Sequence, residues 1–329
     1  MIQERLKALR AEMEKRGITV YVVPTADFHE SEYVGDHFKA RKFITGFTGS
    51  AGTAVITLDE AGLWTDGRYF VQAENQLKDS TVTLYRMGEE GVPTVDEFVK
   101  DRLKEGGCLG FDGRVVNGTW GGRLEKIAAE KKVSMHVTED LIDLIWEDRP
   151  ALSKQPLFIL EEKYSGKSTA DKIGDLRKAM KENGADVHIL TSLYDIAWLL
   201  NIRGNDIDYV PVVLSYLVLN ETECIWFLQE EVVDDKIRAY LEENHITTKP
   251  YDAIYDYVPE IPADAVVLMN RGTVNYRIVN SLDKAIKVVD KPNPTELMKA
   301  VKNKTEVDNT RAAHVKDGVA FTKFMYWLK

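Results

Sequence analysis

Cysteine is nearly absent from this sequence of 329 residues, and the two that occur, Cys108 and Cys224, stand far apart. No Cys-x-x-Cys spacing is present, so the pattern indicates neither a disulfide framework nor a structural zinc site. The six histidines are scattered, and no two stand three or four residues apart, where a helix would bring two metal ligands to one face. Ligands from distant segments could still converge, but structural or surface roles are the favoured interpretation of the histidines.

An excess of positive charge and long apolar runs are also missing. The 43 Lys and Arg residues are outnumbered by 53 Asp and Glu residues, and the net charge of -10 argues against a nucleic-acid partner. No apolar stretch approaches the roughly 20 residues that cross a bilayer, and no secretory signal opens the chain. We therefore expect a cytoplasmic protein. With 44% hydrophobic residues at this length, two folded domains are expected.

The N-terminal part reads as helix, strand and hairpin. Residues 1–16 place apolar side chains at helical spacing, and Gly17 stands where a helix C-cap glycine belongs. The apolar, β-branched run 18–23 follows and is typical of a buried parallel strand. Segments 52–57 and 61–65 flank a polar turn, which predicts a hairpin.

The same order returns further along the chain. Leu176, Met180 and Gly184 repeat Leu9, Met13 and Gly17 at an offset of 167 residues, and a second strand, 187–190, and a second pair of apolar runs, 211–219 and 222–228, follow. A repeat of this length predicts two copies of one fold rather than a solenoid, whose units are about 20 to 50 residues long.

Prolines mark two breaks in the chain. Segment 146–156 contains paired prolines that forbid a continuous helix, and a second break lies at 292–294. We expect domains at residues 1–150 and 151–294, with 295–329 beginning another domain through a helix capped by Thr295 and Glu296. Apolar residues of 305–329 are spaced roughly helically, and we expect the partner of their apolar face to be missing from this chain.

Two polar clusters are candidates for chemistry. The first, 27–33, follows the first strand at the end where parallel sheets meet ligands, and Glu32 and His29 lie in it. A helix capping box made by Asp27 and Glu30 is the structural alternative. The second is 64–70, where Arg68 stands beside aromatic rings and could bind a carboxylate, or form an Asp-Arg pair that pins strand to helix.

Glycine-rich segment 46–52 offers two weaker readings. It superficially resembles the Gly-x-Ser-x-Gly elbow of a serine nucleophile, and its Gly-x-x-Gly-x-x-Gly spacing suggests a phosphate cradle. Both require a helix directly after the segment, whereas a β-branched run follows. A tight turn entering the hairpin is the favoured interpretation. In the second copy, the polar loop 201–206 could face a cleft or solvent.

Taken together, these motifs resemble those of the three-domain cytosolic Xaa-Pro aminopeptidases of the creatinase and prolidase family. The resemblance covers essentially the whole chain. It rests on the opening helix, the residues 29–33 with Arg41, and segments 46–54, 64–70, 145–150, 195–206 and 299–303.

The resemblance implies an α/β fold of two tandem creatinase N-terminal-like domains with mixed sheets, followed by the first helix of a missing "pita-bread" catalytic domain. In the family that domain holds two divalent cations, usually manganese, through two Asp, one His and two Glu, and it cleaves the bond before proline. None of these ligands is expected in this chain, so we expect no catalytic residue and no cofactor in it.

What remains is expected to shape the cleft for peptides with proline at the second position and to support a homodimer. Glu32, Arg41, Arg68 and His29 are the candidates for reaching that cleft. Two other hypotheses are a metal-free interaction module of the same fold and an independent hydrolase with its own site in the polar loops.

Overall fold

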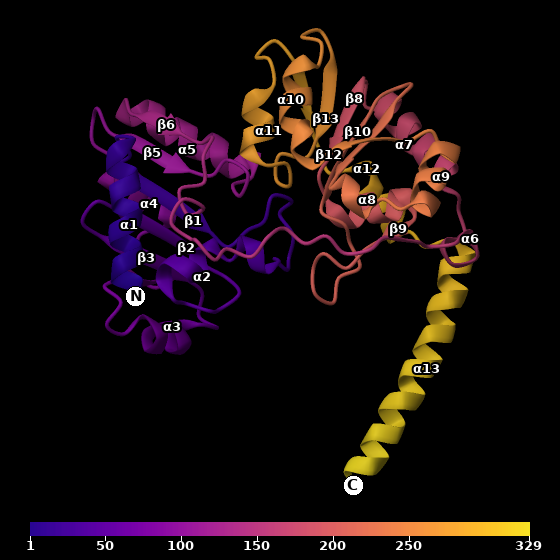
Figure 1. The fold of residues 1–329 in the computed structure, drawn as a ribbon, viewed down its shortest axis with the longest axis horizontal. Coiled ribbons are helices and arrows are strands. Elements are labelled where there is room, and N and C mark those ends of the chain that lie inside the picture. The colour runs from indigo at the N-terminus through magenta and orange to yellow at the C-terminus, as the bar shows by residue number, and fades with distance from the viewer. The chain divides into compact units, whose positions relative to one another are not determined.

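The computed structural model describes residues 1–329 and divides into two compact units (Figure 1). The first unit contains residues 1–153, 255–261 and 271–284, and the second contains 154–254, 262–270 and 285–329. Two segments of the second repeat therefore belong to the first unit. The domain limits at 150 and 294 stay a prediction from the sequence. No helix has the length and apolar character needed to cross a membrane.

The elements of the first unit come mainly from the first repeat. They are α1 (Ile2–Lys15), β1 (Val20–Pro24), η1 (Asp36–Phe38), α2 (Ala40–Thr45), β2 (Thr53–Thr57), β3 (Ala61–Thr65), α3 (Phe70–Leu77), β4 (Thr83–Arg86), α4 (Val95–Arg102), β5 (Cys108–Phe111), α5 (Gly118–Lys131), β6 (Ser134–His136), η4 (Val258–Glu260) and α11 (Tyr276–Ser281).

Helix α10 (Ile254–Tyr257) lies where the chain passes from the second unit to the first. The second unit begins at Lys154. Its elements are β7 (Phe158–Ile159), α6 (Glu162–Ser165), α7 (Thr169–Glu182), β8 (Val187–Leu190), α8 (Leu193–Leu200), β9 (Ile202–Arg203), β10 (Ser215–Leu219), β11 (Cys224–Leu228), η2 (Glu230–Val232), α9 (Asp235–Glu243), β12 (Thr247–Pro250), η3 (Tyr251–Ala253), β13 (Val266–Met269), β14 (Lys287–Asp290), α12 (Pro294–Ala300) and α13 (Lys304–Leu328).

A six-stranded mixed sheet forms the centre of the first unit, in the order β4-β3-β2-β1-β5-β6. Strand β1 pairs antiparallel with β2 and parallel with β5, so only one of its two neighbours has the parallel orientation expected for it. Side chains alternate between the faces of the sheet. Tyr21 and Val23 pack under α1 and α2, whereas Val20 and Val22 pack under α4 and α5.

The second unit repeats this sheet strand for strand, in the order β12-β11-β10-β8-β13-β14. Strand β8 takes the place of β1, with antiparallel β10 on one side and parallel β13 on the other. The expected duplication of one α/β fold with mixed sheets is confirmed.

Equivalent hydrogen bonds recur in both copies. The N–H of Ile18 donates to Met13 O at 2.9 Å after Gly17, whose φ is +67°, and Ala185 N donates to Met180 O at 3.0 Å after the corresponding glycine. Such bonds close a helix whose C′ residue is left-handed, the conformation that favours glycine. The glycine that follows the first helix therefore ends that helix in the same way in both copies.

Three local predictions need correction. No helix follows Asp27, whose Oδ1 accepts the N–H groups of His29 and Ser31 at 2.9 Å each in a turn, so the capping box is wrong. Helix α12 begins with Asn293 as N-cap, so Thr295 is not its cap and Glu296 is the third helical residue.

The expected single apolar face of 305–329 is also wrong. Phe324 follows Val315 by nine residues, which is two and a half helical turns, so the two lie on opposite sides of α13. Both are exposed, at 50% and 68%, and no residue of α13 is buried.

Candidate functional site

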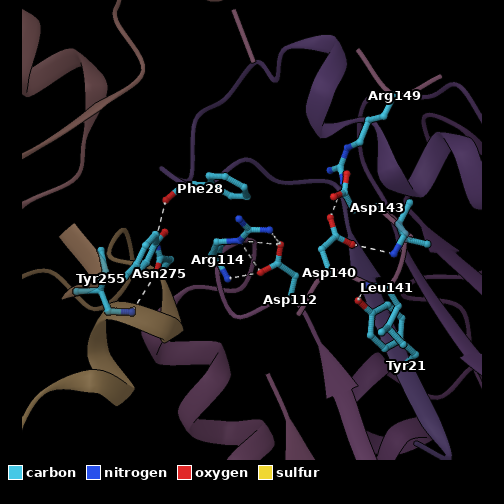
Figure 2. Close-up of polar contacts among 12 residues, drawn as sticks. Tyr21, Phe28, Asp112, Arg114, Asp140, Leu141, Asp143, Arg149, Tyr255 and Asn275 are labelled. Carbon is cyan, nitrogen blue, oxygen red and sulfur yellow. Dashed lines mark hydrogen bonds and ion pairs between the residues drawn. The ribbon is translucent and has the colours of Figure 1, made fainter. Parts of the chain in front are cut away.

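Charged side chains are buried where parallel strands of the first unit end. Asp112 directly follows β5, and Asp140 comes shortly after β6. Both are at least nine-tenths buried, and Arg114 and Arg149 face them (Figure 2). The carboxyl ends of parallel strands are where α/β folds bind ligands, so this cluster is the first candidate for a site.

Each carboxylate has an arginine partner. Arg114 places Nε 3.0 Å from Asp112 Oδ1 and Nη2 3.0 Å from Oδ2, a two-pronged pair. Arg149 Nη1 lies 2.6 Å from Asp140 Oδ2 and 3.1 Å from Asp143 Oδ1. Each carboxylate of the cluster therefore has an arginine partner, and Asp140 and Asp143 share one.

Burial sets the protonation equilibria of this cluster. Burial and then the Asp112 charge raise the pKa of Asp140, against the lowering effect of Arg149. Burial lowers the pKa of Arg114, but the Asp112 carboxylate outweighs it and the pKa is raised overall. Burial, followed by the charges of Asp140 and Asp112, raises the pKa of Tyr21 well above its usual value. Tyr21 therefore stays protonated at neutral pH.

The space at this cluster is too small for a substrate. The cavity lined by Tyr21, Asp112, Asp140 and Arg149 measures about 10 Å³, and a single water needs roughly 10 to 15 Å³. With no room and no unpaired charge, the arrangement can hold the loops after β1, β5 and β6 together but cannot bind a peptide.

A segment of the second repeat closes this end of the first unit. Gly118 N donates to Val274 O at 2.8 Å, and Tyr276 N donates to Val116 O at 2.7 Å, so the two segments exchange equivalent bonds. Asn275 belongs to this junction, and its Nδ2 donates to Phe28 O at 3.1 Å (Figure 2). The loop after β1 is therefore fixed by contacts from both repeats.

Two of the four residues expected at the cleft are joined by a row of aromatic rings. The Arg41 guanidinium lies 4.7 Å from the centroid of the Phe47 ring, which meets the Tyr69 ring edge-on at 5.9 Å. The Arg68 guanidinium lies 5.3 Å from the centroid of Tyr69. Arg41 is buried, whereas the Arg68 side chain is 71% exposed.

Arg41 holds the glycine-rich segment in place. It donates to Thr25 Oγ1 at 2.9 Å, to Phe47 O at 2.6 Å and to Gly49 O. Burial lowers the pKa of Arg41 to about 10. Gly52, with φ +156°, leads directly into β2, and no helix follows the segment, as the tight-turn interpretation expected.

Arg68 forms an ion pair with Asp66, one of the two alternatives that the sequence offered for it. Its Nε lies 2.8 Å from Asp66 Oδ1 and its Nη2 lies 2.9 Å from Oδ2. The hydrogen bonds from Arg68 lower the pKa of Asp66 to about 2. The Arg68 side chain remains largely exposed, so the pair does not exclude a contact with a peptide.

The other two expected residues lie in the loop after β1. His29 is buried and its backbone N–H donates to Asp27 Oδ1, whereas Glu32 is exposed and its side chain makes no hydrogen bond or ion pair within the chain. No hydrogen bond or ion pair joins Glu32 to Arg41 or Arg68. That all four reach a substrate cleft stays a prediction.

No set of side chains in residues 1–329 fits a metal centre. Three or more His, Cys, Asp or Glu groups do not converge anywhere in the chain. The buried carboxylates Asp112 and Asp140 are already paired with arginines. These residues do not fit a pair of divalent cations.

Sequence reasoning missed the buried ion pairs. Asp112 follows a short apolar strand, as Asp27 does, and this position could have indicated that Asp112 lies at the end of a buried strand. Arg149 lies in the 145–150 motif but was not identified as a partner for Asp140.

Comparison with known proteins finds a family match for each repeat. Residues 5–145 and residues 148–306 each match the creatinase/prolidase N-terminal domain. A probable Xaa-Pro aminopeptidase P of Neurospora crassa is 38% identical over 339 residues, which cover 99% of this chain and 49% of the relative. Xaa-Pro aminopeptidase 1 of Dictyostelium discoideum is 33% identical over 337 residues, covering 100% of this chain and 53% of the relative.

A solved structure matches the entire chain. The X-prolyl aminopeptidase of Caenorhabditis elegans, described as a cytosolic enzyme with a di-nuclear active site, has a TM-score of 0.93 and 31% identity. The match covers 100% of this chain and 56% of that one. The chain thus spans about half the length of the relatives it matches.

Proposed function

Because the chain belongs to the creatinase/prolidase family, with a match in each of its two repeats, we propose that it is the non-catalytic N-terminal region of a metal-dependent Xaa-Pro aminopeptidase. The whole enzyme removes the N-terminal residue that precedes proline in a peptide. In it, the N-terminal region shapes the cleft and supports a homodimer. The cytosolic C. elegans relative supports a cytoplasmic location.

One observation carries the proposal. Relatives named as Xaa-Pro aminopeptidases align with 99% to 100% of this chain but with only about half of their own length. The C. elegans protein has a di-nuclear site, whereas no group of three potential ligands converges in the present chain. Under the proposal, two divalent ions, with manganese expected, belong to a catalytic domain outside residues 1–329, and this chain positions that domain.

Helix α13 supports a docking role. Phe321, Phe324 and Trp327 are 63%, 50% and 77% exposed, and they lie within two turns of one helix. Soluble proteins cover apolar patches of this kind when they assemble. We assign the covering surface to the enzyme's own catalytic domain.

A chimera tests this function. The 329 residues would replace the matching part of the C. elegans enzyme, which spans 56% of that protein. With manganese supplied, we expect release of the residue before proline, and a matched chimera lacking residues 1–150 should lose dimerisation or peptide turnover. A folded, metal-loaded full chimera that cleaves nothing would contradict the proposal. Unchanged dimerisation and turnover without residues 1–150 would contradict the role assigned to the first repeat.

A further inference from the structure

A pocket of about 280 Å³ lies entirely within the second unit, where α12 ends and α13 begins. Lys172, Trp198, Arg203, Lys302 and Glu306 are among its lining residues. Three of these side chains are cations and only one is a carboxylate. The pocket belongs neither to the ion pairs of the first unit nor to the residues proposed for the peptide cleft.

Lys172 is the unusual member of this set because a lysine is almost never fully buried without an anionic partner. It is 1% exposed, and its Nζ donates to Trp198 O at 2.8 Å and to Asn201 Oδ1 at 2.7 Å. Both acceptors are neutral. An ammonium has three protons, so one donor remains beyond these two bonds.

Arg203 contributes further unused donors. It is half-buried, and its hydrogen bonds to Ala197 O and Ile202 O are both made by Nη1. The guanidinium has five N–H groups, so those on Nε and Nη2 are left for another acceptor. A planar guanidinium with two adjacent free donors matches the geometry of a carboxylate or phosphate.

The resident carboxylate does not balance these charges. Glu306 Oε2 accepts the N–H of Asn303 at 2.9 Å in the capping box that starts α13, so it is held at the helix end. The N-terminus of this 25-residue helix adds a partial positive charge at the same place. The pocket therefore has surplus positive charge and surplus donors.

We propose that this pocket binds a small oxyanion, a phosphate or a carboxylate group, between Lys172 and Arg203. Lys302 and the first turn of α13 supply additional attraction. Burial lowers the pKa of Lys172 to about 8 although Glu306 opposes the shift, and a bound oxyanion would add to that opposition. Because Glu306 belongs to α13, a bound anion would change how strongly α13 is held against the rest of the second unit.

Calorimetric titration of the 329-residue chain with inorganic phosphate, at pH 7 and constant ionic strength, tests the site. Succinate serves as the second arm, which separates phosphate from carboxylate as the preferred group. We expect saturable binding of at least one of them at one site. Lys172→Met and Arg203→Gln should each weaken it about tenfold or more, since each removes a charge-assisted bond.

Two further variants make the result decisive even where Lys172→Met fails to fold. Glu306→Gln removes the competing carboxylate and should tighten binding severalfold. Lys181→Met removes an exposed lysine from the same helix, α7, and should leave binding unchanged. Absence of saturable binding by either anion, or equal affinities in the wild type, Arg203→Gln and Glu306→Gln, would overturn the proposal. The result does not depend on the peptidase function, because no peptide or metal is involved.

Discussion

Tyr21 and His188 occupy the same place in the two repeats, 167 residues apart, at the second position of β1 and of β8. Tyr21 Oη accepts the N–H of Leu141 at 3.0 Å, so its polar atom is satisfied. His188 Nδ1 pairs with Leu268 O at 2.9 Å, but its Nε2 is buried with no partner. The duplication preserved the backbone here, and the chemistry of the two core positions differs.

His188 therefore predicts acid sensitivity of the second unit. Burial lowers the pKa of His188 below its usual value of 6.5, so the folded state resists protonation. The unfolded chain binds the proton first as pH falls, and the stability contributed by neutral His188 is present above pH 6.5 and lost below it. Between the two pKa values the loss is about 1.4 kcal/mol per pH unit.

Urea unfolding of the wild type and of His188→Phe at pH 7.0, 6.0 and 5.0 measures this loss. The difference in free energy of unfolding between the two should shift in favour of the variant as pH falls. A difference that stays constant over this range would show that His188 is not the responsible group.

Lys172 predicts a stability change at the opposite end of the pH scale. Its pKa is lowered to about 8 in the fold, against 10.5 as its ordinary value, because burial disfavours the charge. The unfolded state holds the proton longer as pH rises, so stability increases between pH 8 and about 10. Lys172→Met removes the titrating group, and its free energy of unfolding should lack this increase. Parallel pH profiles for the two proteins would contradict the assignment.

The Arg149–Asp140 pair predicts a large cost when one partner is removed. The side chains are each 7% exposed, and Arg149→Met leaves a buried carboxylate without compensation. We expect a loss of about 3 to 5 kcal/mol in the free energy of unfolding of the first unit. Adding Asp140→Asn to Arg149→Met should restore part of it.

Arg68→Met is the matched control, because its ion pair with Asp66 is exposed. It should leave the free energy of unfolding nearly unchanged. Equal effects of the two arginine substitutions in urea unfolding would mean that burial does not set the strength of these pairs.

Glu32 and Arg68 are the two expected cleft residues with exposed side chains, and they predict an effect on activity without one on stability. In the chimera, Glu32→Gln and Arg68→Gln should lower kcat/KM for an Xaa-Pro peptide severalfold while the unfolding midpoint stays unchanged. Arg41→Met should instead lower the midpoint, because Arg41 anchors Phe47 and Gly49. Unaltered kinetics in both exposed variants would remove them from the cleft.

The repeated elements could be predicted because local residues determine them. The helix that ends at Gly17, the strand after it and the hairpin at Asp59 depend on neighbouring side chains, and the offset of 167 residues reproduced them. The capping box at Asp27 failed because the side chain bonds two nearby N–H groups in a turn, which competes with helix formation.

The buried ion pairs could not be read from sequence because tertiary structure creates them. Asp112 lies two residues before Arg114, so that pair could be noticed in the sequence, but Asp140 meets Arg149 across nine residues of turns and irregular structure. Nor does any local pattern place Asn275 against Phe28, 247 residues earlier. The pocket at Lys172 likewise combines segments that lie up to 150 residues apart.

Peptide turnover by the 329-residue chain alone tests most directly whether the cleavage machinery lies elsewhere. The purified chain would be incubated with manganese and an Xaa-Pro peptide, with the intact C. elegans enzyme as the positive control. The expected result is release of the N-terminal residue by the control and none by the chain. Release by the chain that a chelator abolishes would place a metal centre among these residues, and release that survives chelation would reveal an independent hydrolase.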